Sequence, residues 1–378
     1  MSIFWYISPV DGRFTWHPEG RYKVDHSRLL RLANTLDKNG FDGALIGTYA
    51  HDVLVTASSL IASTDKLKFL IPIYPGVVPP ALLAQQALTF DDYSNGRLML
   101  NLVNGTDSTL AKYGVFVDHD ERYEMSLEYW KIFKDLYSGK NVSFTGKYFS
   151  KSGTNTASGA ENIPTQLPLG PIQEPCIPLW GAGASPAGIH HAANIVDTYL
   201  AFFQSKEKLQ KQLEEFNNKL KETGRSAELG TLATVIVRKT RKEALDFFKM
   251  QLANTNPKQL AAQINAALIG NGVVDGLAGL KPKDPKTYRR IEALLNGQLP
   301  AIEDLEIAPN TYAGLASWAQ FDLNETGGGS TMIGSGEDVA EIIRSLRTEL
   351  NLQHFILSGW PLEQEANYAA EYLLPLIK

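Results

Sequence analysis

A glycine-rich segment near the middle of the chain is the clearest place where this sequence could hold a ligand. Residues 179–186 read Leu-Trp-Gly-Ala-Gly-Ala-Ser-Pro, between a short apolar run and a helical pattern. The free N–H groups and the dipole at a helix start attract anions, Pro186 suits the first helical position, and Ser185 adds a hydroxyl. The segment predicts a phosphate site, but a tight turn without a ligand has the same pattern. It is not the dinucleotide fingerprint, because the third glycine is out of place, and it has no P-loop lysine.

A second polar segment, Asp-His-Asp-Glu-Arg-Tyr-Glu at 118–124, lies just before a helical pattern that contains Trp130 and Phe133. Acidic residues are also common in the first turn of a helix, where they interact with its dipole. Taken alone, the segment favours that structural interpretation, and a catalytic role needs further support.

Metal and nucleophile motifs are missing. The seven histidines form no HExxH pattern, and His190 and His191 are adjacent on a predicted helix, where neighbours point apart. There is no G-x-S-x-G elbow, and the single cysteine, Cys176, has no nearby base in the sequence. We therefore expect no metal site, and we expect a cofactor to supply the chemistry.

Charge and composition limit the partners and the location. The net charge is -5 without a long basic run, which argues against nucleic acid and acidic membranes as partners. A lone cysteine fits a reducing compartment, the N-terminus lacks the pattern of a secretion signal, and no apolar run reaches the length of a membrane span. These features predict a cytoplasmic protein, and a hydrophobic fraction of 44% allows a large core.

Short apolar runs alternate with amphipathic helical stretches, which is typical of repeated βα units. About eight strands can be identified, within 1–9 and at 43–46, 67–73, 98–103, 178–180, 196–201, 232–237 and 354–357. Helices are predicted between them, among them 52–63, 80–92 and one whose apolar face is Leu209, Leu213, Phe216 and Leu220. We expect a single (β/α)8 TIM-barrel domain over residues 1–378, with its functional residues at the C-terminal ends of the strands.

Two stretches interrupt the alternation, after the fourth and seventh predicted strands. The first is a hairpin at 142–150 followed by a loop to residue 175. The second, 254–329, has weak helices and ends in three consecutive glycines. A long insertion with glycine hinges near a strand end suits an active-site lid, so we do not expect a separate domain there.

Taken together, these residues resemble the bacterial-luciferase-like flavin monooxygenases, and within them the reduced-flavin-dependent alkanesulfonate monooxygenases. The resemblance covers nearly the whole chain, in family order. It rests on Phe4-Trp5, Gly43 to Ile46, Leu67 to Leu70, Ser94 to Arg97, Asn101 to Gly105, Asp118 to Glu124, Val235 to Arg238, Ala308 to Asn310 and Leu357 to Gly359. Each piece is weak singly, and together they are specific.

The resemblance implies a (β/α)8 barrel that binds FMN as FMNH2 and uses O2 to oxidise a small-molecule substrate. It places the flavin ring near Asn101, Val103 and Asn104. Four residues would hold the phosphate, namely Tyr123, Gly183, Ala184 and Ser185. It also implies a separate NAD(P)H:FMN reductase and a homodimer or homotetramer.

The sulfonate-binding residues of that branch are largely replaced here. Leu232 and Thr234 stand where the branch has an arginine and a histidine, and Glu325 aligns with a loop arginine. The Tyr-Pro-His of the branch becomes Trp360-Pro361-Leu362, and its cysteine after the second strand becomes Ala50. Burying a sulfonate without an arginine is unfavourable, so we expect a less anionic substrate.

By the same comparison, the side chains nearest the reaction would be His51, Thr234 and Trp360, and the substrate pocket would include Trp5, Tyr49 and Glu325. Structural roles are also open, because the two tryptophans could fill the barrel mouth and His51 could cap the next helix.

The leading hypothesis is therefore a flavin-dependent monooxygenase. A deazaflavin-dependent oxidoreductase on the same barrel and a non-catalytic flavin-binding protein are the alternatives. Carbon–sulfur cleavage, N-oxidation and Baeyer–Villiger insertion fit the sequence equally well.

Overall fold

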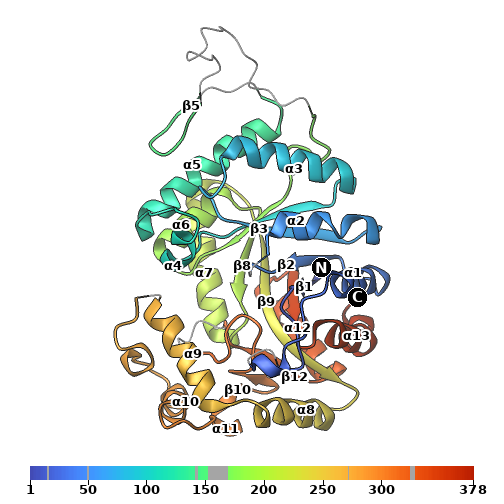
Figure 1. The fold of residues 1–378 in the computed structure, drawn as a ribbon, viewed down its shortest axis with the longest axis vertical. Coiled ribbons are helices and arrows are strands. Elements are labelled where there is room, and N and C mark those ends of the chain that lie inside the picture. Colours follow the sequence, from blue (N-terminus) through green and yellow to red (C-terminus); the bar gives the residue numbers. More distant parts are fainter. Residues whose placement is uncertain (15–16, 49–50, 141–143, 152–168, 271, 324–327) are drawn as a thin grey trace.

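The computed structural model describes residues 1–14, 17–48, 51–140, 144–151, 169–270, 272–323 and 328–378. Its centre is a closed barrel of eight parallel strands (Figure 1). These strands are β1 (Ser2–Ile7), β2 (Gly43–Ile46), β3 (Lys68–Ile73), β4 (Leu98–Leu102), β7 (Leu179–Ala182), β8 (Thr198–Phe202), β9 (Glu228–Arg238) and β13 (His354–Ser358). The ring closes where β13 pairs with β1, from Ser2 opposite His354 to Trp5 opposite Leu357. The predicted barrel is confirmed.

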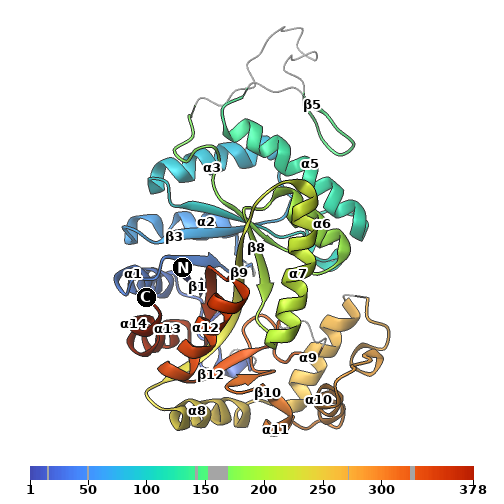
Figure 2. The ribbon, with the colours of Figure 1, turned by 180° about the vertical axis from the view of Figure 1, so that it is seen from behind.

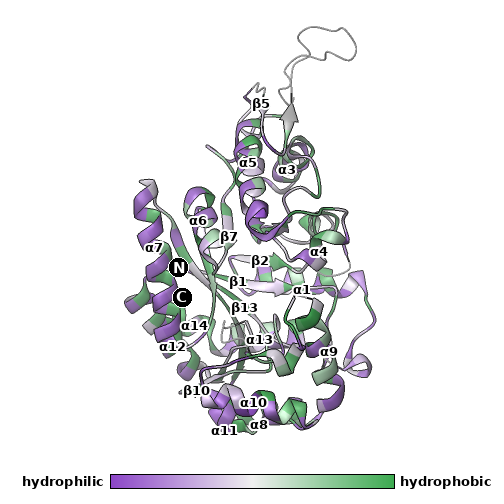
Figure 3. Ribbon diagram, turned by 90° about the vertical axis from the view of Figure 1, so that its left-hand side faces the viewer, coloured by the Kyte–Doolittle hydropathy of each residue, from purple (hydrophilic) through white to green (hydrophobic). Residues whose placement is uncertain are grey.

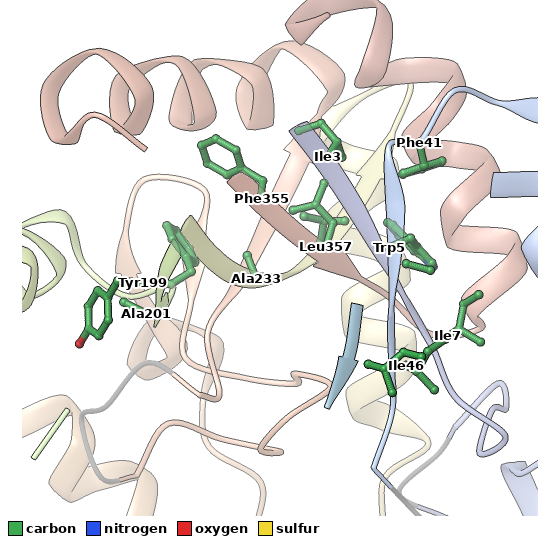
Figure 4. Packing of buried hydrophobic residues seen from close by; sticks show 14 of the residues in the cluster. Ile3, Trp5, Ile7, Phe41, Ile46, Tyr199, Ala201, Ala233, Phe355 and Leu357 are labelled. Carbon is green, nitrogen blue, oxygen red and sulfur yellow. The ribbon is translucent and has the colours of Figure 1, made fainter. Parts of the chain in front are cut away.

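Side chains alternate between the inside and the outside of the barrel, as the two-residue period of a strand requires. The inside is filled by one residue from each of the eight strands, listed in ring order as Phe4, Leu45, Leu70, Met99, Trp180, Leu200, Leu232 and Ile356. The outward residues of β1 are Ile3, Trp5 and Ile7, and they belong to the larger cluster between the strands and the helices (Figure 4).

Helices cover the outside of the barrel (Figures 1 and 2). They are α1 (His26–Lys38), α2 (Val53–Ser58), α3 (Pro80–Ser94), α4 (Asp107–Ala111), α5 (His119–Tyr137), α6 (Pro186–Ile195), α7 (Lys206–Thr223), α8 (Arg241–Ala253), α12 (Gly336–Leu350), α13 (Leu362–Tyr372) and α14 (Leu374–Ile377). The helix predicted over 52–63 is shorter than expected. It ends at Ser58, and a separate 3-10 turn spans Ile61–Ser63.

The predicted apolar face of α7 is confirmed. Its buried residues are the four predicted ones, Leu209, Leu213, Phe216 and Leu220, and Figure 3 shows many hydrophilic residues along the same helix. In the part of the chain that the structure describes, no helix is both long and apolar enough to cross a membrane.

The first insertion follows β4, as predicted, and contains a hairpin of β5 (Phe144–Thr145) and β6 (Ser150–Lys151). The carboxylate of Glu128 on α5 accepts hydrogen bonds from the backbone N–H groups of Lys147, Tyr148 and Phe149. One side chain thereby ties the hairpin to the helix beneath it.

The second insertion lies between β9 and β13, as predicted. It contains α9 (Pro257–Gly270), the 3-10 turn η3 (Gly276–Gly279), α10 (Pro285–Leu295), α11 (Ile302–Leu305), β10 (Glu306–Ala308) and β11 (Thr311–Tyr312). An unpredicted strand, β12 (Thr331–Ser335), follows the insertion. It pairs antiparallel with β11 of the insertion and in parallel with the C-terminal half of β9. The insertion is therefore joined to the barrel through the sheet.

Candidate active site

A cavity of about 420 Å³ lies at the C-terminal ends of the barrel strands. Most of its lining comes from strand ends and the loops after them, and the rest from two helices and the second insertion. The lining comprises Tyr6, Leu45 to Thr48, Pro72, Asn101 to Gly105, Tyr123, Ala182 to Ala184, Leu200 to Phe202, Gln212, Leu232 and Trp318. This end of a (β/α)8 barrel is where active sites are found.

One wall of the cavity carries two asparagines with unpartnered polar atoms. Asn101 is at the end of β4 and Asn104 is in the loop after it, and both are buried. The Oδ1 atom of Asn101 and both amide atoms of Asn104 have no hydrogen-bond partner in the structure. Leaving a buried polar group unpaired costs roughly 1–3 kcal/mol. These atoms therefore point to a polar ligand in the cavity, beside Val103.

The glycine-rich segment forms the adjoining part of the cavity. Gly183 and Ala184 line it, and Ser185 is the N-cap of α6, with its hydroxyl accepting a hydrogen bond from the backbone N–H of Gly188 at 3.1 Å. A Cβ atom on Gly183 would lie 2.7 Å from the Cα atom of Gly188. Glycine is needed at both positions because the end of β7 and the first turn of α6 approach so closely, and this leaves the helix N-terminus facing the cavity.

Tyr123 of α5 also lines the cavity, beside the same helix turn. Its hydroxyl would be 3.1 Å from a Cβ atom on Gly188, and its ring is 5.7 Å from the ring of His191. The Nε2 atom of His191 is 2.7 Å from the hydroxyl of Ser126. Burial, followed by the neighbouring His190, lowers the pKa of His191 to about 4. A neutral imidazole therefore supports Tyr123 at neutral pH.

A chain of hydrogen bonds fixes the backbone of Gly183. Its carbonyl accepts from the hydroxyl of Tyr199 at 2.8 Å, and that hydroxyl accepts from Nε2 of Gln212 at 3.0 Å. Gln204 in turn donates to Oε1 of Gln212 at 3.1 Å. The carbonyl of Gly183 is thus engaged with Tyr199.

Arg122 holds the β4 loop from beneath. The guanidinium is buried, donates to the carbonyl of Gly105 at 2.9 Å and pairs with Asp107. Asn104 precedes Gly105, so this contact fixes the polar wall of the cavity. The interpretation of 118–124 as a helix start is confirmed, with Asp118 at the N-cap position of α5, and the same segment also supplies Arg122 and Tyr123 to the site.

A second wall of the cavity is aromatic. Trp318 of the second insertion packs against Tyr6 at the end of β1, with ring centroids 5.7 Å apart, and against Phe202 at the end of β8, with centroids 6.1 Å apart. Burial raises the pKa of Tyr6 to about 12, so its hydroxyl is neutral at physiological pH. None of the described residues that line the cavity is an aspartate, glutamate, lysine, arginine or histidine.

Thr234, predicted near the reaction, is 2% exposed and already engaged. Its hydroxyl accepts a hydrogen bond from the backbone N–H of Ser317 at 2.9 Å and lies 3.3 Å from the hydroxyl of Ser358. Ser358 also donates to the hydroxyl of Ser317 at 2.7 Å. These hydroxyls join the insertion to the middle of β9 and to the end of β13.

The two tryptophans expected at the substrate lie outside the cavity lining. Trp5 points away from the barrel interior, is fully buried and packs against Phe41 at 5.5 Å between ring centroids (Figure 4). Trp360 is also buried, and its ring packs behind Tyr6 at 6.3 Å. For Trp5, the expected direct contact with a substrate is corrected to a packing role, because the alternation of β1 brings Tyr6 rather than Trp5 to the cavity. The role of Trp360 at the substrate stays a prediction.

His51 lies in an adjoining pocket of about 750 Å³, which shares Thr48 and Pro72 with the barrel cavity. Tyr74 and Tyr113 form another side of this pocket, with ring centroids 6.2 Å apart. The neighbouring Asp52 caps α2, so His51 is not the cap. Its role in the reaction stays a prediction. Tyr49 and Glu325 lie outside the described residues.

No group of three or more metal-ligating side chains is present within the described ranges. Burial raises the pKa of the Cys176 thiol to about 12.

Sequence reasoning missed several residues of the cavity, above all Tyr6, Phe202, Gln212 and Trp318. Phe4, Trp5 and Tyr6 are all aromatic, so the strand pattern alone does not show which of them face inward. Trp318 is about 80 residues after β9 in the chain, and only tertiary packing brings it to the barrel mouth.

Comparison with known proteins agrees with this architecture. A family model described as luciferase-like monooxygenase matches residues 10–353. Two similar solved structures are a riboflavin lyase (TM-score 0.76, 16% identity, 100% of this chain and 91% of that one) and a long-chain alkane monooxygenase (0.75, 18%, 99% and 90%). A third is a coenzyme F420-dependent tetrahydromethanopterin reductase from Methanopyrus kandleri (0.70, 16%, 100% and 99%). At these identities the structural likeness shows the fold.

Proposed function

Because the chain belongs to the luciferase-like monooxygenase family, we propose that it is a monooxygenase that binds reduced FMN and uses oxygen to oxidise a small, uncharged organic substrate. The observation that supports this most is the division of the cavity into two walls. One presents unpartnered amides next to a helix N-terminus, and the other presents aromatic rings without a charge.

The residues present fit FMN. The Oδ1 atom of Asn101 and both amide atoms of Asn104, which have no partner within the protein, can pair with the polar edge of the flavin ring, beside Val103. Tyr123, Gly183, Ala184 and Ser185 would hold the phosphate at the start of α6. Reduced flavin supplies the electrons with which oxygen is activated, so the protein itself needs no nucleophile or metal.

The protein's own contribution is to bind, orient and exclude water. Tyr199 and Gln212 hold the Gly183 carbonyl fixed, and Arg122 holds the loop of Asn104. Trp318 covers the apolar wall from the side of the insertion, which supports the role of 254–329 as a lid.

The lining also supports the replacement of a sulfonate by a less anionic substrate. Leu232 takes part in the apolar wall, and Thr234 uses its hydroxyl for the insertion. Away from the start of α6, burying an anion among these uncharged groups would be costly, because none of the described lining residues carries a positive charge that could pair with it. His51, in the adjoining pocket, is the nearest described candidate for a contact with a substrate that extends beyond the cavity.

We further propose that a separate NAD(P)H:FMN reductase supplies the reduced cofactor, that the protein works in the cytoplasm and that it forms a homodimer or homotetramer. These proposals rest on the family and on the composition of the chain.

The proposal is tested by titrating reduced FMN into the protein without oxygen, and then adding oxygen with a substrate panel of matched neutral and sulfonated compounds. We expect tight binding of reduced FMN and an oxygen-dependent product from a neutral compound. Binding of a deazaflavin in place of FMN would support the hydride-transfer alternative, and FMN binding without turnover of any compound would support a non-catalytic role.

A further inference from the structure

The second insertion supplies one wall of the cavity. Within it, an isolated antiparallel bridge pairs Gly314 with Phe321, and the chain between them carries Ser317 and Trp318 over the strand ends. Trp318 is the only residue that the insertion adds to the described lining. Its position therefore decides the shape of the mouth on that side.

Three rings from distant parts of the chain meet at this wall. Trp318 is tilted by 60° to Tyr6 and by 52° to Phe202, at the centroid distances given above. Such separations are typical of interacting aromatic pairs, and the tilts leave ring faces and edges available to a further ring. Below them lie Leu45, Leu200 and Leu232 at the top of the barrel core.

The position of Trp318 is fixed by its neighbour. The backbone N–H of Ser317 donates to Thr234, and the hydroxyl of Ser317 accepts from Ser358. Both partners are fully or almost fully buried, Thr234 in the middle of β9 and Ser358 at the end of β13. Thr234 and Ser358 are therefore positioning residues for Trp318.

We propose that Tyr6, Phe202 and Trp318 form a binding site for a planar, uncharged aromatic ring of the substrate, and that Trp318 is the residue that selects it. This inference rests on the proposed function, because it takes the wall of Asn101, Asn104 and the glycine-rich turn to be occupied by the flavin. Aromatic rings discriminate planar from saturated rings through their preferred stacked and edge contacts, and a wall without a cation disfavours an anion.

The test is calorimetric binding of three probes that share a carbon skeleton to the FMN-loaded protein. The probes are 2-naphthol, its saturated analogue decahydro-2-naphthol and the anion 2-naphthalenesulfonate. We expect 2-naphthol to bind about tenfold more tightly than the saturated analogue, and the sulfonate to bind more weakly still. Equal affinity for the planar and saturated rings, or tightest binding of the sulfonate, would overturn the proposal.

The role of Trp318 is tested with Trp318→Ala and Trp318→Phe. Alanine should weaken 2-naphthol binding about tenfold and erase the preference over the saturated ring, while phenylalanine should keep most of it. The matched control is Tyr93→Ala on α3, an aromatic residue that is 73% exposed and outside the cavity lining. An unchanged preference in Trp318→Ala would contradict the proposal.

The positioning role of Thr234 is tested by a double-mutant cycle. Thr234→Val should weaken 2-naphthol binding in the wild-type protein and have no further effect in Trp318→Ala. Equal effects in both backgrounds would reject positioning through Trp318. The affinity for FMN is measured first on every variant, because it separates this inference from the proposed function. If the wild-type protein does not bind FMN, the proposed function is rejected. If it binds FMN but shows no preference among the probes, only this inference is rejected.

Discussion

The two walls of the cavity are built in different ways. The amide and glycine wall comes from consecutive units of the barrel, β4 with α5 and β7 with α6, and its residues lie close to recognisable sequence segments. The aromatic wall joins β1, β8 and Trp318 of the second insertion, a residue that lies more than 300 positions after β1 in the chain. The proposed cofactor site is thus built from local motifs, whereas the proposed substrate site depends on contacts between distant segments.

The walls also differ in how their residues are held. Hydrogen bonds from Tyr199, Gln212 and Arg122 fix the backbone of the amide and glycine wall. The aromatic wall is held by ring packing and by the hydroxyls of Thr234 and Ser358. We therefore expect changes in the first wall to alter FMN binding, and changes in the second to alter substrate choice.

The largest effect is expected for Gly183→Val. The new side chain would collide with the backbone of Gly188 and separate β7 from the start of α6. Losing two charged hydrogen bonds to the phosphate, at roughly 1.5–3 kcal/mol each, should weaken FMN binding at least about a hundredfold. Quenching of flavin fluorescence measures the affinity. Gly270→Ala, where an added Cβ meets nothing within 4 Å, is the control and should bind FMN normally.

The next largest effect is a loss of stability when the pH is lowered. His191 has an ordinary pKa of 6.5 that falls to about 4 in the folded protein. As the pH drops below 6.5 the unfolded chain takes up a proton that the folded protein does not, so the free energy of unfolding falls, by about 2 kcal/mol between pH 7.5 and pH 5. His191→Gln should reduce this loss in urea unfolding. His190→Gln, an exposed neighbour, should not, and an identical loss in all three proteins would show that the imidazole is not the cause.

A smaller effect is expected at Asn104, where a substitution should weaken FMN binding without lowering the free energy of unfolding. Its amide has no partner within the protein. Asn104→Leu should weaken FMN binding about tenfold, which corresponds to roughly 1.4 kcal/mol. The free energy of unfolding without FMN should not fall, because no hydrogen bond within the protein is lost. A clear loss of stability with unchanged FMN affinity would assign Asn104 to the fold rather than to the cofactor.

The smallest effect is expected for Tyr6→Phe. Because the pKa of Tyr6 is raised to about 12, its hydroxyl does not ionise in the physiological range, and the ring provides the contact with Trp318. The rate of product formation should change by less than about threefold, and its pH profile should stay the same. A large fall in kcat with unchanged KM would instead make the hydroxyl a proton donor in the reaction.

The division between the walls explains how much the sequence could predict. The eight strands, the two insertion points and the glycine-rich turn at the start of α6 follow from periodicity and from helix-start residues, which are local signals. Trp5 was placed wrongly because aromatic residues occupy both faces of β1, so alternation gave no contrast. The position of Trp318 and the end of α2 at Ser58, within the helix predicted over 52–63, depend on tertiary packing, which a local pattern does not contain.

The most direct test of the central claim compares the affinity of the protein for FMN with its affinity for riboflavin, which lacks the phosphate. If the start of α6 holds a phosphate while the asparagines hold the ring, FMN should bind at least about a hundredfold more tightly than riboflavin. In Gly183→Val the two ligands should bind with similar, weak affinity. Equal affinity of the wild-type protein for both ligands, or failure to bind either, would contradict the account.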